Sequence, residues 1–244
     1  MALYPNLTRA EYDALPGINW SALKAGIGKT AEHIRAAKRG RKDTPAFRFG
    51  RLFHLAKLQP DLFAALTVVD TKTTTRSDRI TNDEAVTIGD MLRQADLIPH
   101  EITNCETAVT WTFGGVACKG LIDGLMGSRV CDLKTTQNAE PAAFKAEIFK
   151  FKYHAQLAFY TDGLRANGVS IDGASILAVE KSDPHAAALY DLSPAWLDLG
   201  RTVYEEALAV WAADGPATYG RQELDVPDWC DPGVRMNAEG GIDL

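Results

Sequence analysis

Residues 120–125, Gly-Leu-Ile-Asp-Gly-Leu, together with residues 130–135, Val-Cys-Asp-Leu-Lys-Thr, decide the fold of this chain. Each segment has the apolar character of a buried strand and carries one carboxylate. Gly127-Ser128 between them is a turn signal, so the two strands are predicted to pair as a hairpin.

Three charged side chains belong to this hairpin: Asp123, Asp132 and Lys134. Strand side chains alternate between faces, so Asp132 and Lys134 point the same way, and pairing of the strands brings Asp123 towards Asp132. Close carboxylates repel and raise each other's pKa. Mg²⁺ removes that repulsion, because it is usually held by one or two carboxylates plus a substrate phosphate, and a nearby lysine can orient water or balance phosphate charge. The pattern therefore fits either a structural ion pair or a small site for phosphodiester hydrolysis.

The length and the composition indicate a globular α/β protein. The chain has 244 residues, enough for one sizeable domain or two small ones with an ordinary core. Its apolar runs are far shorter than a membrane span, and the first residues, Met-Ala-Leu-Tyr-Pro, lack the basic and apolar regions of a signal peptide. We therefore expect a cytoplasmic protein with no membrane partner.

The cysteines do not form a metal-binding pattern. Four are present and none pairs in a C-x-x-C spacing, which argues against ligation of zinc or an iron–sulfur cluster. Cys118 and Cys131 lie in apolar strand contexts, so we expect both to be buried, reduced thiols.

Charge is distributed unevenly along the chain. The formal net charge is −6, but residues 24–57 hold ten Lys/Arg and two acidic residues, for a local charge of +8. Residues 190–244 hold eleven acidic residues and three Arg, for a local charge of −8. This asymmetry suggests one basic and one acidic face. The basic run fits a nucleic-acid partner and also fits a plain solvated helix surface.

The N-terminal part is predicted to be mainly helical. Residues 1–19 are interpreted as an irregular arm, and the Thr/Lys/Arg-rich residues 67–81 as a loop that either faces phosphate or is simply exposed. Capping residues and apolar periodicity predict a helix that is capped by Asn19 or Ser21 and runs through Leu23, and further helices over residues 31–39, 46–58 and 82–95. Residues 26–30, Gly-Ile-Gly-Lys-Thr, lack the first glycine of a phosphate-binding loop and follow no strand, which argues against an ATP site.

The remainder predicts a sheet followed by a long helix. Apolar and alternating runs predict strands over residues 106–113, 116–125, 129–135, 174–181 and 187–192. Helices are predicted over residues 141–151, 153–167 and 194–213, before a Pro/Gly/Asp-rich tail anchored by Trp229. We expect a single domain, 1–244, made of a helical part (1–100), a sheet core (101–192) and a C-terminal helix with its tail (193–244).

Several helical polar residues have two interpretations. Gly50 and His54 lie one turn apart, where the glycine would let a neighbouring backbone approach, and in isolation His54 is best interpreted as a core histidine. Gln156 and Tyr160 share a helix face and are either polar groups at the edge of the core or groups that hold a nucleotide or a water. Glu106 is the first residue of the predicted strand meander, and it either reaches the metal region or lies exposed at the edge of the sheet.

Four motifs follow one another in an order that resembles a known family. They are GRLFH at 50–54, GLID at 120–123, DLKTT at 132–136 and YHAQLAFY at 153–160. Their order and spacing are similar to those of the RecB-like branch of the PD-(D/E)xK nucleases. The similarity is greater still to the RecE-type (exonuclease VIII-like) recombination nucleases of phages and prophages. PGINWSALK at 16–24 also resembles that family's opening helix, and the resemblance covers about residues 12–192.

The resemblance implies an α/β (α+β) fold, a PD-(D/E)xK nuclease core in which a central mixed β-sheet is flanked by helices and carries a Mg²⁺ site. Mn²⁺ is expected to substitute. The implied metal-binding groups are His54, Asp123, Asp132 and the backbone carbonyl of Leu133. By the same resemblance, Lys134 positions or activates water, while Gln156 and Tyr160 contact DNA or the active-site wall. Glu106 matches only a loosely defined acidic position.

The implied activity is a Mg²⁺-dependent, ATP-independent 5′→3′ exonuclease that degrades linear double-stranded DNA. It would leave 3′ single strands for recombination by a strand-annealing protein, act as a ring-like trimer or tetramer, and be phage- or prophage-encoded in a bacterial host. The basic segment and the Thr-rich loop would then supply DNA contacts: Lys38, Arg39, Arg41, Lys42, Arg48, Arg51 and Arg76. Two alternatives remain: a related nuclease of different polarity or with single-strand or structure specificity, and a non-catalytic DNA-binding relative.

Overall fold

The computed structural model describes residues 2–5, 7–40, 44–213, 215, 218–221, 235–236 and 242–243. The helices are α1 (Arg9–Ala14), α2 (Trp20–Leu23), α3 (Ala31–Lys38), α4 (Pro45–Leu58), α5 (Pro60–Ala64), α6 (Asn82–Asp96), α7 (Pro141–Phe151), α8 (Tyr153–Ala166) and α9 (Pro194–Ala213), with a 3-10 turn η1 (Lys24–Gly26). The strands are β1 (Ala2–Tyr4), β2 (Thr67–Val69), β3 (Arg79–Thr81), β4 (Thr107–Phe113), β5 (Val116–Ile122), β6 (Gly124–Met126), β7 (Arg129–Thr136), β8 (Gly173–Glu180), β9 (Ala187–Leu192), β10 (Arg235–Met236) and β11 (Ile242–Asp243).

The central sheet is mixed. Its order is β6-β7-β8-β9, with β7 and β8 parallel and both outer pairs antiparallel. Parallel neighbours need a long crossover, and here α7 and α8 supply it between β7 and β8. A second sheet, β1-β4-β5, is antiparallel throughout. The predicted α/β class with a mixed sheet is therefore confirmed.

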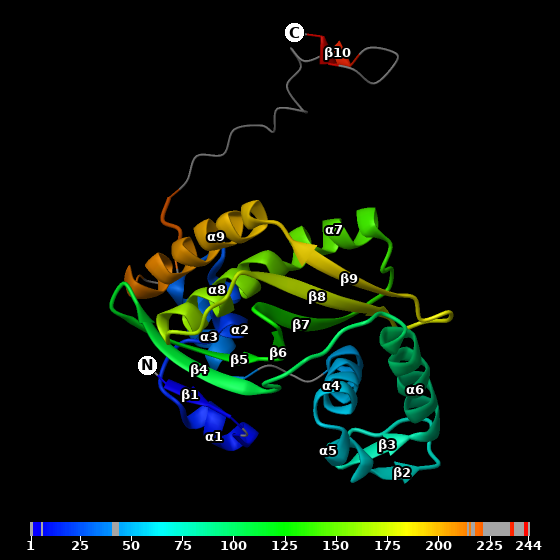
Figure 1. The fold of residues 1–244 in the computed structure, drawn as a ribbon. Helices are drawn as coiled ribbons and strands as arrows, with labels where there is room; N and C mark the ends of the chain where they lie inside the picture. Colours follow the sequence, from blue (N-terminus) through cyan, green and yellow to red (C-terminus); the bar gives the residue numbers. More distant parts are fainter. Residues whose placement is uncertain are drawn as a thin grey trace.

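Helices cover both faces of the central sheet (Figure 1). α7, α8 and α9 lie over one face, while α4 and α6 lie against the other. The side chains of β7 divide between the two layers: Val130 packs in the apolar cluster that contains α8 and α9, whereas Cys131 and Leu133 pack in the cluster of α4 and α6. Asp132 and Lys134 share the face of Val130, because side chains alternate along a strand.

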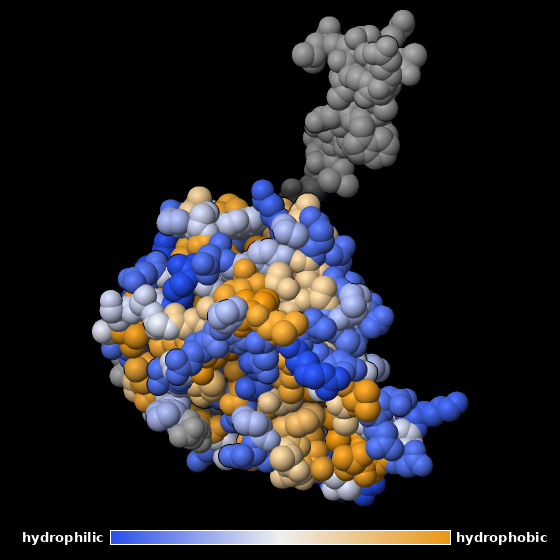
Figure 2. Space-filling view, turned by 45° about the vertical axis from the view of Figure 1, so that its right-hand side comes forward, coloured by the Kyte–Doolittle hydropathy of each residue, from blue (hydrophilic) through white to orange (hydrophobic). Residues whose placement is uncertain are grey.

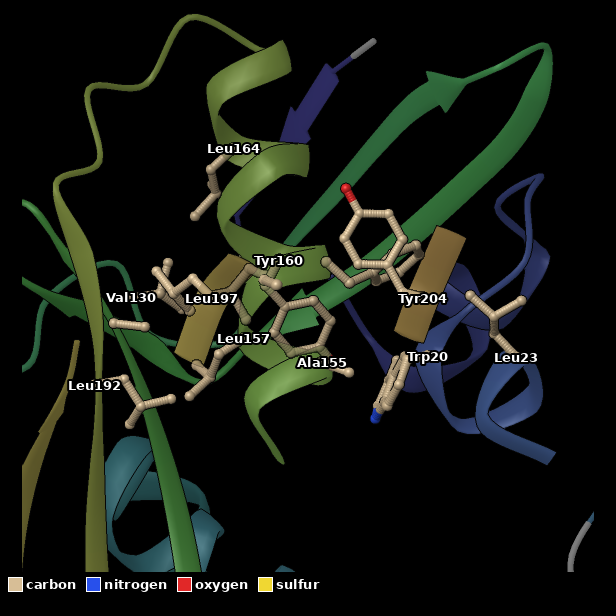
Figure 3. Close-up of a cluster of buried hydrophobic side chains, with 14 of the residues drawn as sticks. Trp20, Leu23, Val130, Ala155, Leu157, Tyr160, Leu164, Leu192, Leu197 and Tyr204 are labelled. Atoms are coloured by element: carbon tan, nitrogen blue, oxygen red, sulfur yellow. The ribbon is translucent and has the colours of Figure 1, made fainter. Parts of the chain in front are cut away.

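The core on the α8 side is built around α8 itself (Figure 3). Val130, Leu157 and Leu192 gather between this helix and the strands, while Trp20 and Tyr204 approach from the other side. On the outer surface shown in Figure 2, apolar and polar side chains are interleaved. In the described part of the chain, no helix combines the length and the apolar character needed to cross a membrane.

The predicted strand 116–125 is interrupted, contrary to expectation. β5 ends at Ile122 and β6 begins at Gly124, and the two strands belong to different sheets. A side chain at Gly124 would place its Cβ 2.2 Å from Ile102 Cγ2, so only glycine fits where the chain changes sheets. The break leaves Asp123 at the junction of the two sheets.

Two further expectations were wrong in detail. The arm 1–19 is not irregular, because β1 pairs with β4 and Thr8 caps α1 through a capping box. Residues 67–81 are not loop throughout, because their ends pair as the parallel strands β2 and β3. Trp229, the expected anchor of the tail, lies outside the described residues.

Most other element boundaries agree with the predictions. β9 and α9 begin and end at the predicted residues, and α4 begins one residue earlier, with Thr44 accepting the capping hydrogen bond from Phe47 N–H. Cys118 and Cys131 are buried free thiols, as expected. The three-part division of the chain stays a prediction.

Candidate active site

The hairpin β6–β7 brings the two aspartates together. Gly124 pairs with Cys131, so Asp123, one residue earlier, lies beside Asp132, one residue later. The backbone N–H of Leu133 donates to Asp123 Oδ2 at 2.8 Å, which fixes this carboxylate against β7. The predicted convergence of the two carboxylates is therefore present in the structure.

His54 reaches the same point from α4. Its Nδ1 lies 3.5 Å from Asp123 Oδ2, and its Nε2 lies 3.0 Å from the carbonyl oxygen of Leu133. A carbonyl can only accept, so Nε2–H donates to it, and Nδ1 faces the Asp123 carboxylate, which accepts a hydrogen bond from Nδ1–H when the ring is protonated. A Cβ at Gly50 would lie 3.7 Å from Thr135 Oγ1, an ordinary contact, so the close approach expected at this glycine is not required.

Glu106 is the residue that sequence reasoning underweighted. Its backbone N–H donates to the carbonyl oxygen of Asp123 at 3.2 Å, and its carboxylate joins His54 and Asp123 in a group whose ligand atoms all lie within 4.8 Å of one another. The signal was the β4–β5 hairpin: counted from its Gly114-Gly115 turn, Thr107 pairs with Ile122, so Glu106 falls opposite Asp123.

Asp132 and Lys134 form the second half of the site, on the α8 face of β7. The two side chains form an ion pair, with Asp132 almost fully buried. Gln156 Nε2 of α8 donates to Asp132 Oδ1 at 2.9 Å and lies 3.5 Å from the Tyr160 hydroxyl. A Cβ at Gly120 would lie 3.0 Å from the Tyr160 ring, so this glycine makes room for the tyrosine that closes the wall. The structure thus brings together all six predicted catalytic residues.

The pKa values of the acids reflect this crowding. Burial, with the Asp123 charge added, raises the pKa of Glu106 to about 7. Burial likewise raises the pKa of Asp132 to about 6, although Lys134 opposes the shift. Burial opposes ionisation of Asp123 too, but His54, Lys134 and the Leu133 N–H more than offset it, so the Asp123 pKa is lowered.

The bases shift in the complementary direction. Burial disfavours the charged forms of His54 and Lys134, yet the neighbouring aspartates outweigh it and raise both pKa values. The site therefore groups charged side chains of both signs away from bulk solvent, and the pKa values of its acids differ from one another. Such environments are typical of catalytic centres.

A cleft of about 460 Å³ opens onto the acids. It is lined by residues from α1, α4 and the β4–β5 sheet, among them Arg9, Tyr12, Arg51, His54 and Asp123. The cleft reaches the site from the α4 side, and its wall includes Arg51 and Arg9, of which Arg9 pairs with Asp13 at 3.0 Å.

The donor set fits a hard divalent cation. One imidazole nitrogen and two carboxylates converge in the group of His54, Glu106 and Asp123, and a second buried carboxylate, Asp132, lies beside Asp123. The Leu133 carbonyl accepts from His54, and an interaction of that kind orients a ligating histidine.

The predicted DNA contacts fare unequally. Arg48 is buried, forms an ion pair with Glu84 and donates to the Arg79 carbonyl at 2.7 Å, so its guanidinium is engaged within the fold. Exposed Arg39 and Arg76 pair with Glu32 and Asp78 at 3.2 and 2.9 Å. Lys38 is exposed and lies over the Trp211 ring, and Arg51 lies on the cleft wall. Arg41 and Lys42 lie outside the described part of the chain.

Comparison with known proteins gives a family and a fold. Residues 20–213 match the family described as "PDDEXK-like domain of unknown function (DUF3799)". A solved structure titled "Putative exonuclease" from Eubacterium rectale superposes with a TM-score of 0.60 at 13% identity, covering 86% of this chain and 88% of that chain. At this identity the match shows a shared fold.

A second solved structure is more distant. The alkaline exonuclease LHK-Exo from Laribacter hongkongensis superposes with a TM-score of 0.43 at 14% identity, covering 84% of this chain and 93% of that chain. No curated protein matches the sequence.

Proposed function

Because this chain belongs to the PDDEXK-like family DUF3799, we propose that it is a Mg²⁺-dependent exonuclease acting on linear double-stranded DNA. Family membership confirms the predicted PD-(D/E)xK resemblance, and the fold shared with the Eubacterium rectale structure is consistent with the RecE-like form of it. The family and the fold support a nuclease, and PD-(D/E)xK nucleases generally use divalent metals.

One observation carries the proposal: the motif residues meet in space although they come from four separate parts of the chain. His54 contacts Asp123, Asp123 lies beside Asp132, and Asp132 is held by Lys134 and Gln156. A structural ion pair would need only Asp132 and Lys134. Such an ion pair gives no reason for Asp123, Glu106 and His54 to converge beside it on a cleft, whereas a metal-dependent active site does.

His54, Glu106, Asp123 and Asp132 would hold the metal, with the Leu133 carbonyl as a further oxygen donor. Bound Mg²⁺, or Mn²⁺ in its place, would polarise the scissile phosphate and offset the negative charge that develops on it. Lys134, kept as an ammonium by Asp132, would orient the attacking water and contribute positive charge to the attacked phosphate. Gln156 holds Asp132 in register by donating to Oδ1, and Tyr160 forms the wall behind it.

The finer features follow the RecE-type resemblance. We assign 5′→3′ polarity, no requirement for ATP, and release of 3′ single strands that a strand-annealing protein would use in recombination. The same resemblance supports a ring-like trimer or tetramer encoded by a phage or prophage and acting in the bacterial cytoplasm. Within the DNA path, Arg51 on the cleft wall is the predicted contact nearest to the acids.

The test is digestion of linear, 5′-phosphorylated double-stranded DNA with Mg²⁺ and without ATP, beside closed circular DNA. We expect loss of the linear form only, with labelled 5′ ends released first. The Asp132→Ala variant should be inert and still folded, because it loses a metal ligand but also loses a buried carboxylate that repels Asp123. Wild-type protein that binds linear DNA without shortening it, over a range of Mg²⁺ and Mn²⁺ concentrations, would overturn the proposed function.

A further inference from the structure

The junction between α7 and α8 exposes aromatic rings that the core does not use. Phe149 and Phe151 are 54% and 36% exposed, whereas Phe144 and Ile148 on the same helix are buried. The Phe149 ring stacks against the buried His154 ring, with centres 6.0 Å apart, yet both phenylalanines keep a large part of their apolar surface in water, which costs solvation free energy. We refer to Phe149, Phe151, Lys150, Lys152 and Lys24 together as the α7–α8 aromatic surface.

Lysines lie directly over these rings. Lys152 Nζ is 4.2 Å from the centre of the Phe149 ring, and the Nζ atoms of Lys150 and Lys24 are 5.3 and 5.8 Å from the centre of the Phe151 ring. Lys24 comes from η1, far away in the sequence, so two separate segments supply charge to one surface. Lys152 adopts the left-handed conformation (φ 60°) that turns the chain from α7 into α8.

The aromatic surface is continuous with the active site. The Phe151 and Tyr153 rings are 5.6 Å apart between centres, and Lys134 Nζ lies 4.8 Å from the centre of the Tyr153 ring. A row of rings and ammonium groups thus runs from Phe151 through Tyr153 to Lys134 and Asp132. α7 and α8 lie on the face of the central sheet opposite α4, so this row leaves the site on the side away from the cleft wall formed by α4 (Figure 1).

We propose that the α7–α8 aromatic surface binds single-stranded DNA next to the scissile phosphate, with bases stacked on Phe151 and Phe149 and phosphates paired with Lys150, Lys152 and Lys24. Base–aromatic stacking combined with lysine contacts is the general chemistry of single-strand binding. The proposal rests on the proposed nuclease function. In this proposal, the DNA strand that passes Lys134 continues onto the α7–α8 aromatic surface. The duplex lies on the other side of the site, in the cleft next to α4.

Charge complementarity favours a nucleic acid over a second protein. Interfaces between proteins are depleted of lysine in their centre, whereas here every exposed ring carries an ammonium group. The only acid among residues 144–152 is Glu147, and it is engaged by the Thr136 hydroxyl at 3.0 Å. Single-stranded DNA suits such a surface, because its phosphates can pair with the lysines and its bases can stack on the aromatic rings.

The experiment measures fluorescence anisotropy of a short 5′-phosphorylated single strand on the full-length protein in EDTA, so that binding is observed without cleavage. Phe151→Leu keeps an apolar side chain and removes the ring, and it should weaken the Kd about tenfold. Phe151→Trp should retain binding, since it keeps a stacking face. Phe47→Leu is the matched control, because Phe47 is 46% exposed on α4 and lies outside the proposed surface, and its Kd should be unchanged.

Two further arms identify what is bound. An oligonucleotide with abasic sites should bind the wild type at least about tenfold more weakly. The loss caused by the abasic sites should be smaller for Phe151→Leu, because this variant has already lost one of the two stacked bases. The double variant Lys150→Gln/Lys152→Gln should lower the slope of log Kd against log salt by about 1.4, two phosphate contacts at ~0.7 each for a single strand.

The outcomes separate this proposal from the proposed function. If the wild type and Phe151→Leu bind intact and abasic strands with equal affinity and both still digest linear duplex, the proposed role of the aromatic surface is overturned and the nuclease function stands. Base-dependent binding through Phe151 in a protein that digests no DNA supports the surface and overturns the nuclease. A Phe151→Leu variant that changes its sedimentation but not its DNA affinity shows contact between copies of the chain and also overturns the proposal.

Discussion

Lys119 on β5 is buried and Lys134 on β7 is largely removed from solvent, but the two ammonium groups have very different partners. Lys119 Nζ donates to three backbone carbonyls at the end of α1: those of Tyr12, Asp13 and Leu15, at 3.0, 3.0 and 2.7 Å. Lys134 instead forms an ion pair with Asp132 and lies over the Tyr153 ring. Burial lowers the pKa of Lys119, whereas the aspartates raise that of Lys134.

The difference shows how a buried charge reveals its role. An ammonium group has three protons to donate, and at Lys119 all three are used by the last carbonyls of a helix, so this lysine ties α1 to the sheet. At Lys134 the partner is a carboxylate that belongs to a crowded acidic site. The Lys119 ammonium is satisfied by backbone and serves the fold, whereas the Lys134 ammonium belongs to the acidic site that we propose acts on a substrate phosphate.

The largest effect is expected from Lys134→Met. Loss of one preorganised charge at the reacting phosphate should lower the rate of linear-duplex digestion by about 10²–10³-fold. The fold should persist, because Asp132 can take up a proton and stay hydrogen-bonded to Gln156. Digestion assays and thermal melting check the two parts, and digestion within a few-fold of wild type would return Lys134 to a structural ion pair.

The matched change, Lys119→Met, should do the reverse. Three helix-end carbonyls lose their donor, which should lower the free energy of unfolding by about 3 kcal/mol, measured by urea denaturation. Exposed Lys145→Met on α7 is the control and should change stability by less than about 0.5 kcal/mol. A Lys119→Met protein as stable as wild type would remove the contrast between the two lysines.

Glu106→Gln tests whether the β1-β4-β5 sheet, which contains Lys119, also supplies a metal ligand, since Glu106 directly precedes β4 of that sheet. The amide keeps the size but removes the charge beside Asp123 and His54. We expect the Kd for Mn²⁺, measured by calorimetry, to rise at least about tenfold. Unchanged metal affinity would exclude Glu106 from the ligand set and confine the chemistry to β7 and its neighbours.

The smallest effect concerns His154, another buried basic group, which lies in the first turn of α8. Its Nδ1 is 3.2 Å from the Ile148 carbonyl oxygen, and its Nε2 has no hydrogen-bond partner among the described residues. Burial lowers its pKa below 6.5, so the unfolded chain binds the proton more tightly and stability is lost as pH falls through that value. His154→Phe should remove this loss of stability between pH 7 and pH 5, measured by denaturation at each pH. An unchanged pH profile would assign the loss to other groups.

Much of the site was accessible from local patterns. The Gly127-Ser128 turn and strand alternation together predicted that Asp123, Asp132 and Lys134 converge, because a hairpin register depends only on residues near its turn. Glu106 was equally accessible through the Gly114-Gly115 turn, and it was underweighted because an acidic residue at a strand end carries no chemistry until its partner is known.

Other features depended on contacts between distant segments. Arg48 lies in a basic run that suggested a DNA contact, yet Glu84 and the Arg79 carbonyl draw it inside. β1 pairs with β4 across about a hundred residues, and β2 with β3 across the Thr-rich loop, so neither arm nor loop showed its strands locally. At the break after Asp123, Ile102 occupies the space that a Cβ at Gly124 would need, a contact between separate segments that no periodicity expresses.

The sequence by itself determined the hairpin, most of the longer helices and strands, and the chemical identity of the acids, lysine and histidine. It did so because periodicity, capping and turn propensity act between residues that are close in the chain. Only the tertiary structure decided which charges face the cleft, which lysine caps a helix, and where aromatic rings remain exposed beside the site. Those outcomes depend on which distant partner satisfies a buried polar group, and burial creates that demand only after the sheet and its two helical layers have packed together.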